Sequence, residues 1–163
     1  MIQNPDVTTR RIRNEDALAD LGLAAATKLR ADSLLSAYGL QCVEQRTYWV
    51  RYESTIAVVQ FVFDGTRSGE LAVYLGRMRN GHEEPRPLFS LEEILRWHKR
   101  HEASQISGLT VKSKDDIMKW VEILTKLVTR YGDLLLKGDE NTYLSLVEFR
   151  RRELADFEKK RRH

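Results

Sequence analysis

The sequence predicts an α+β fold, in which helices from both ends of the chain pack on an antiparallel sheet formed by its middle part. Residues 40–76 alternate with period two and are rich in valine, tyrosine and phenylalanine, as strands are. Apolar residues before and after this segment recur at helical spacing. The breaks between the predicted strands are short, which favours antiparallel neighbours. With 163 residues, the chain is long enough for one such domain.

Residues 14–38 predict an N-terminal helix. Asn14 is a good N-cap, the apolar residues that follow it keep helical spacing, and Gly39 is a natural stop. Gly22 is a point at which this helix could divide. We expect residues 1–13 to form a flexible polar arm. Asp20 and Gly22 interrupt the apolar segment that an export signal would need, so we expect no such signal.

Residues 40–52, 55–63 and 70–76 predict three strands, which together form an antiparallel meander. The first connection is Glu53-Ser54, and the second is a run of turn-forming residues that begins at Asp64. Side chains alternate between the two faces of a strand. The first strand therefore places Arg46, Tyr48 and Tyr52 on the same face of the predicted sheet.

The C-terminal half predicts a short helix and then two long ones. Ser90 and Glu93 form a capping box before the short helix at 91–98. The apolar stripe of the next helix extends over residues 113–138, and Asp139 caps the last helix. We expect the two long helices to pack as a long helical hairpin on the sheet. Residues 14–158 would then be one α+β domain, and residues 159–163 a basic frayed tail.

The charge of the chain is concentrated at its C-terminus. The formal net charge is +3 and the pI about 9.0, but the last 14 residues hold seven basic and three acidic side chains. The rest of the chain is close to neutral, without the basic stripe that a nucleic-acid-binding face usually has. Apolar runs such as residues 56–59 are far shorter than the roughly 20 residues of a membrane span, so we expect no membrane partner.

One cysteine, Cys42, excludes an internal disulfide and favours a cytoplasmic protein. His98 and His101 lie three residues apart beside Glu102, but the third or fourth ligand of a metal site is not visible. The chain has no glycine-rich phosphate loop, no nucleophile elbow and no His-Glu-x-x-His motif. We therefore expect no metal, no cofactor and no catalytic centre.

One motif points the other way. Arg96 and His101 form an Arg-x-x-x-x-His pattern that resembles the active-site motif of a class of all-helical ribonucleases. The resemblance implies a small metal-independent ribonuclease that uses these two residues. The predicted meander departs from that all-helical fold, and such pairs arise readily by chance in a chain this rich in arginine.

Two features favour binding. The first is an open sheet face with Arg46, Tyr48 and Tyr52, joined by Tyr74 of the third strand, which could stack bases or anchor a protein. The alternative is that these tyrosines pack beneath the N-terminal helix with their hydroxyls at the rim. The second is the basic C-terminal segment with Arg150 and Arg151, of which the plain interpretation is a solvated helix end.

We therefore expect a non-enzymatic cytosolic protein-binding module. A small, motif-free α+β protein of this composition resembles, in general character, bacterial immunity-type proteins and accessory subunits that mask or join a protein partner. The alternative is a nucleic-acid-binding protein that uses the sheet aromatics and the basic C-terminal helix. Leu144 and Leu146 on one side of that helix, and Val147 and Leu154 on the other, also favour a homodimer.

Overall fold

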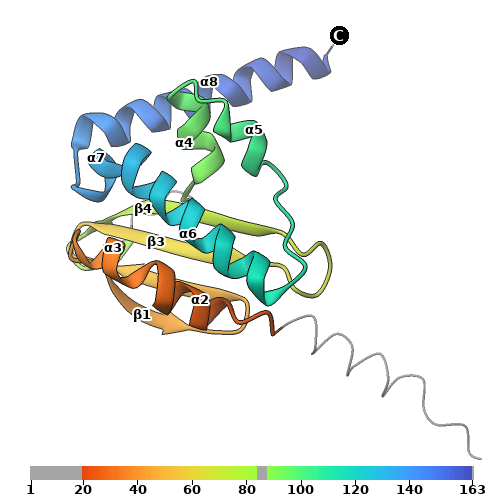
Figure 1. Cartoon of the computed structure of the whole chain (residues 1–163). Coiled ribbons are helices and arrows are strands. Elements are labelled where there is room, and N and C mark those ends of the chain that lie inside the picture. The colour runs from red at the N-terminus through yellow and green to blue at the C-terminus, as the bar shows by residue number, and fades with distance from the viewer. Residues whose placement is uncertain (1–19, 84–87, 163) are drawn as a thin grey trace, which may run out of the picture.

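The computed structural model describes residues 20–83 and 88–162. The predicted arm at 1–13 and the start of the predicted first helix lie outside these residues. Within them, the chain mixes helices with an antiparallel sheet and ends in a long helix, so the α+β class is confirmed. Figure 1 shows helices lying across one face of the sheet and along one of its edges.

The sheet contains more strands than the three predicted. β1 (Gln41–Gln45), β2 (Trp49–Glu53), β3 (Ala57–Phe63) and β4 (Leu71–Arg79) pair in chain order, all antiparallel. The two-residue strands β5 (His82–Glu83) and β6 (Phe89–Ser90) both pair with β4. The meander is therefore confirmed, but its strand count was wrong.

The extra long strand arises because the segment predicted as one strand at 40–52 is a hairpin. The Arg46 N–H donates to the Trp49 carbonyl over 2.7 Å and closes a two-residue turn at Thr47-Tyr48. Two-residue hairpin turns usually contain glycine or asparagine. This turn contains neither, and strand-forming residues continue through it, so the sequence carried no turn signal.

The helices form two groups in Figure 1. α2 (Leu23–Arg30), α3 (Asp32–Ser36) and α6 (Lys114–Tyr131) pack together over one face of the sheet. The second group lies at the β4 edge of the sheet. There β4 is contacted by α4 (Leu91–Trp97) and α7 (Asp133–Leu136), while α5 (Glu102–Ile106) and α8 (Glu140–Arg161) pack on α4. Within residues 20–38, the predicted N-terminal helix is divided at Ala31 into α2 and α3, and Gly22 stands at the N-cap of α2.

The core lies between the sheet and α6. Alternate residues of β3 and β4 point to the same face, and Phe61 pairs directly with Val73 in the register of the two strands. Both are fully buried together with Leu124 and Val128 of α6. The spacing of apolar residues that predicted α6 is therefore the spacing of its core-facing side.

Local signals located the helix starts correctly. The Ser90, Ser113 and Asp139 side chains each accept a hydrogen bond from the backbone N–H three residues later. The helix ends were less predictable, since α6 stops at Tyr131 instead of continuing to Gly138. The short helix α5 was not predicted. α8 extends through Lys159 to Arg161, so part of the predicted frayed tail is helical.

Gly132 is the reason that α6 and α8 do not form the predicted hairpin. A Cβ atom at Gly132 would lie 2.7 Å from both Leu75 Cδ2 and the Val128 carbonyl oxygen. The missing side chain lets the chain pass close to β4, and α7 then turns it with Leu135 and Leu136 buried. α8 consequently packs on α4 and α7 rather than along α6.

We expect Gly132→Ala to lower the free energy of unfolding by about 1–3 kcal/mol, because the added methyl group overpacks the contact with β4. Urea denaturation followed by tryptophan fluorescence measures this. Ser145→Ala, at an exposed position of α8, is the control and leaves the stability unchanged. Equal stability of Gly132→Ala and the parent chain would show that the contact is looser than the structure indicates.

Candidate protein-binding surface

The second half of α8 extends beyond the body of the protein. The buried residues of α8 are Thr142, Tyr143 and Leu146, all within its first two turns. No residue from 147 to 162 is buried. In Figure 1 this part of α8 passes over α4 and then continues past it toward the C-terminus. We call residues 153–162 the overhang.

α8 is tied to the body at its start. Arg77 of β4 is only 7% exposed, and its guanidinium lies 4.3 Å from the ring centre of Tyr143. The same guanidinium binds the Glu140 carboxylate in the first turn of α8. A buried arginine needs a charged partner to offset its lost hydration. This pair therefore fixes where α8 begins.

Two reciprocal ion pairs then hold α8 against α4. The Arg150 guanidinium donates to both oxygens of Glu93 over 2.9 Å, and Arg96 donates to both oxygens of Glu153 over 3.1 and 3.0 Å. Each helix supplies one arginine and one glutamate, three residues apart, so both lie on one side of the helix. Two-point arginine–carboxylate pairs are among the stronger polar contacts in proteins. We call these four residues the clamp.

Arg150 is the more deeply set of the two arginines. Its side chain is 23% exposed, and it also donates to the Leu88 carbonyl over 2.8 Å and covers the Phe89 ring at 4.5 Å. Arg96 is 38% exposed and binds Glu92 within its own helix as well as Glu153. The Arg150–Glu93 pair thus contributes more to the attachment of α8.

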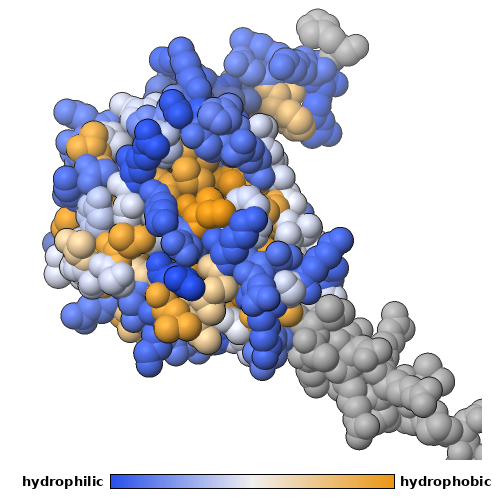
Figure 2. All heavy atoms as spheres, viewed as in Figure 1, coloured by the Kyte–Doolittle hydropathy of each residue, from blue (hydrophilic) through white to orange (hydrophobic). Residues whose placement is uncertain are grey.

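Beyond the clamp, two large apolar side chains lie open to solvent. Leu154 and Phe157 are each 58% exposed. Together with Lys160 and Asp156 they line a groove whose other residues are the four members of the clamp. Figure 2 shows a hydrophobic patch on the side of the overhang that faces the body, with hydrophilic residues around it.

The patch continues the buried face of α8. One side of α8 is formed by residues at intervals of four and three, which keeps them in line along a helix. They are Tyr143, Val147, Arg150, Leu154 and Phe157. Tyr143 is buried, Val147 is partly buried, and Leu154 and Phe157 are exposed. The body ends before the apolar stripe does, so nothing in the described residues covers its last two members.

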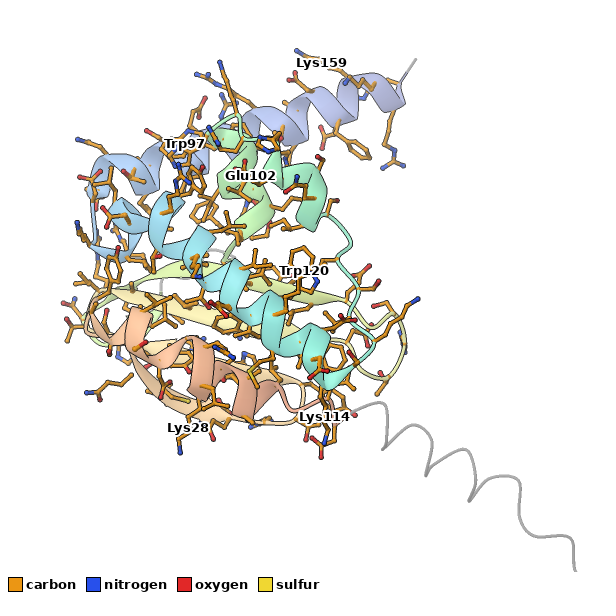
Figure 3. The ribbon with its side chains drawn as sticks, viewed as in Figure 1. Lys28, Trp97, Glu102, Lys114, Trp120 and Lys159 are labelled. Carbon is orange, nitrogen blue, oxygen red and sulfur yellow. The ribbon has the colours of Figure 1, made fainter. Side chains whose placement is uncertain are left out.

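The end of the overhang is basic. Four consecutive cations end the described chain, and they form no ion pair with any of its described residues: Lys159, Lys160, Arg161 and Arg162. The Arg161 guanidinium lies 5.9 Å from the Phe157 ring centre. Figure 3 shows Lys159 at this end, far from Trp97 on α4 and Glu102 on α5. A charged rim around an apolar centre is typical of protein interfaces.

The sheet face predicted for binding does not assemble. Tyr52 is 1% exposed, and its hydroxyl donates to Asp32 of α3 over 2.6 Å, as in the alternative that places the tyrosines beneath the N-terminal helix. Tyr74 pairs with Gln60 in the sheet register, on the face opposite to Tyr52. The prediction of one shared face was wrong because the turn at Thr47-Tyr48 takes Arg46 and Tyr48 out of the strand. The register of β2, β3 and β4 then places Tyr74 opposite to Tyr52.

The remaining predicted binding residues lie apart from one another. Tyr48 is in the β1–β2 turn and 37% exposed, and Arg46 beside it binds Glu44 over 2.6 Å. Arg151 is exposed and binds Glu148, as Arg152 does. Hydrogen bonds from these two arginines lower the pKa of Glu148 to about 2. Of the predicted binding residues, only Arg150 lines the groove.

The histidines His98 and His101 have different partners. The two residues of the predicted ribonuclease motif, Arg96 and His101, each have carboxylate partners. His101 Nδ1 lies 3.4 Å from Glu102, and Arg96 is bound by Glu92 and Glu153. The His98 Nε2 atom lies 2.9 Å from the Tyr131 carbonyl. Within residues 20–83 and 88–162, no three metal-ligating side chains gather in one place.

Sequence reasoning placed Lys160 in a frayed tail and considered Leu154 as a dimer contact, but it did not identify Leu154 and Phe157 as one exposed surface. The signal for these two apolar residues was present in the apolar stripe of the last helix, which was assigned to a hairpin with the preceding helix.

No family model matches the chain, and comparison with curated proteins and with solved structures finds no match. None of the described helices combines the length and the apolar character of a membrane span.

We expect Arg150→Met to lower the free energy of unfolding by about 2 kcal/mol, because it leaves the half-buried Glu93 carboxylate without its partner. Arg151→Met is the matched control, since it removes an exposed arginine from the same helix. Urea denaturation measures stability, and hydrogen exchange of the α8 amides measures its attachment. Equal effects of the two substitutions would contradict the role of the clamp.

We expect the protein to lose stability as the pH is raised from 10 toward 12. Burial, followed by the hydrogen bond to Asp32, raises the pKa of Tyr52 above its ordinary value of 10.0. Burial and the hydrogen bond to Asp133 raise the pKa of Tyr38 to about 12. A raised pKa means that the folded state favours the neutral phenol. The resulting contribution to the free energy of unfolding is fully present below pH 10, the ordinary tyrosine pKa. It is lost as the pH rises from there through the raised pKa of the folded state.

Urea denaturation at a series of pH values measures this loss. Tyr52→Phe cannot ionise at that position and shows a shallower decline, whereas Tyr48→Phe, which changes an exposed tyrosine, keeps the decline of the parent chain. The same decline in Tyr52→Phe as in the parent chain would contradict the assignment to Tyr52.

Proposed function

We propose that this chain is a protein-binding module, and that the overhang of α8 is the element that meets the partner. The observation that carries the proposal is the exposure of Leu154 and Phe157 on the side of α8 that is buried at Tyr143 and partly buried at Val147. Isolated exposed apolar residues are ordinary on protein surfaces. Here they extend an apolar stripe and line a groove, which favours an interface.

The charges of the groove also support binding rather than chemistry. The four residues of the clamp form ion pairs with one another, and these pairs hold α8 in place. The apolar centre and the basic rim remain for contact with another molecule. A masking or accessory role in a bacterial cytoplasm, as the composition predicts, fits a module of this kind. The single cysteine, which is unpaired, supports a reducing compartment.

A nucleic-acid-binding role has less support. Tyr52 is buried and cannot stack on bases, and Arg150 and Arg151 both bind glutamates. A ribonuclease would need Arg96 to leave the two carboxylates that bind it.

Affinity purification of the tagged full-length chain from the cell that encodes it tests the proposal. We expect a stoichiometric protein to co-purify with the parent chain and to be lost with Leu154→Ser/Phe157→Ser, because the apolar centre of the interface is removed. Leu29→Ser is the matched control, since Leu29 is 70% exposed on α2, away from the groove.

Two results would contradict the proposal. One is co-purification that Leu154→Ser/Phe157→Ser leaves unchanged. The other is equal loss with Leu29→Ser, which would indicate a general effect of removing surface apolar groups. Far-UV circular dichroism checks that each variant keeps the total helix content of the parent chain.

A further inference from the structure

We infer that the partner contributes an acidic amphipathic helix, which lies in the groove between α4 and the overhang. This inference rests on the proposed function, because it names the chemistry of the occupant of the same groove.

The apolar centre of the groove is small and linear. Leu154 and Phe157 are one turn apart on α8 and form one wall of the groove, and the α4 residues Glu93 and Arg96 form the other. Helices that dock in grooves present apolar side chains at intervals of three and four residues. The apolar side of such a helix matches the Leu154–Phe157 pair.

The charges beside this centre select an acidic occupant. In residues 156–162, four basic side chains outnumber the two acidic ones, and the basic ones form no ion pair within the described chain. Lys160 lines the groove, and Arg161 follows Phe157 by one turn on the same side of α8. Carboxylates that flank the apolar residues of the incoming helix would pair with these two cations.

A second copy of this chain fits less well. If two overhangs pair antiparallel so that Leu154 of one meets Phe157 of the other, Arg161 faces the second copy's Arg150. If they pair in parallel, Arg161 faces the same residue of the second copy. Both arrangements bring like charges together along the apolar stripe, which disfavours self-association.

A membrane or an RNA duplex fits less well for a reason of shape. The patch faces the body across the groove, as Figure 2 shows, and α4 forms the opposite wall. A flat bilayer cannot enter a groove between two helices, and neither can a duplex. A single helix can, because it is no wider than the helices that already pack there.

Selection from a displayed peptide library tests the inference on the full-length chain. The library consists of helical peptides about four turns long, with apolar residues at intervals of three and four and with Glu, Gln and Lys randomised at the flanking positions. We expect the parent chain to enrich Glu at these positions. We expect no enrichment with Leu154→Ser/Phe157→Ser.

The affinity of an enriched peptide is then measured by fluorescence anisotropy. Lys160→Gln/Arg161→Gln/Arg162→Gln should weaken binding about tenfold, since the exposed ion pairs of Lys160 and Arg161 with the incoming carboxylates are lost together with the positive charge of Arg162. The matched control is Lys28→Gln/Lys112→Gln/Lys114→Gln, which neutralises three exposed lysines on other elements and leaves the affinity unchanged. Added salt should weaken binding to the parent chain in the same direction.

Four outcomes would overturn the inference. Peptides that need Leu154 and Phe157 but show no preference for Glu would overturn the acidic occupant and leave the proposed function standing. The absence of any peptide that needs these two residues would also overturn it. In that case the proposed function fails only if co-purification of the native partner is unaffected as well.

The other two outcomes concern the competing occupants. One is a dimer, seen by sedimentation velocity, that Leu154→Ser/Phe157→Ser dissociates. The other is binding of polyuridylate or of phosphatidylserine-rich vesicles that the triple glutamine variant of the overhang abolishes and the control variant does not.

Discussion

The reciprocal pairing of Arg150 with Glu93 and of Glu153 with Arg96 is the constraint on which the exposed surface depends. Because each helix carries one charge of each sign, the clamp fixes position as well as attachment. A slide of α8 by three residues would place Glu153 against Glu93. Ion pairs often contribute little to stability, but a two-point pair with limited exposure contributes more, and register is a well-attested use of such pairs. The direction in which Leu154 and Phe157 face therefore follows from these four side chains.

Other polar contacts complete the framework that supports α8. The Tyr38 hydroxyl donates to Asp133 over 2.6 Å and links the end of α3 to α7. The Tyr52 hydroxyl ties β2 to α3 in the same way. The apolar core holds the sheet against α6, whereas α8 is joined to that core mainly through its first two turns, Arg77 and the clamp. The molecule thus has a well-packed body and one helix that is less covered by it.

Features encoded by neighbouring residues could be predicted from the sequence, and features set by distant ones could not. The caps at Ser90, Ser113 and Asp139 depend on residues three positions apart, and they were located correctly. The turn at Thr47-Tyr48 was missed because strand-forming residues continue through it. The path of α8 depends on Gly132 passing close to Leu75 and on Arg150 meeting Glu93, which lie 57 residues apart in the chain. An apolar stripe also looks the same in sequence whether a neighbouring helix covers it or leaves it open, so Leu154 and Phe157 were assigned to a hairpin.

The short length of the overhang has a consequence of its own. Fewer than three turns follow Glu153, and a detached peptide of that size would be mostly unfolded in water. The helical form of this end is inherited from the clamped segment before it. Conditions that weaken the arginine–glutamate pairs, such as concentrated salt, would therefore unwind the segment that follows them, and the module would lose its capacity to recognise a partner before its body unfolded.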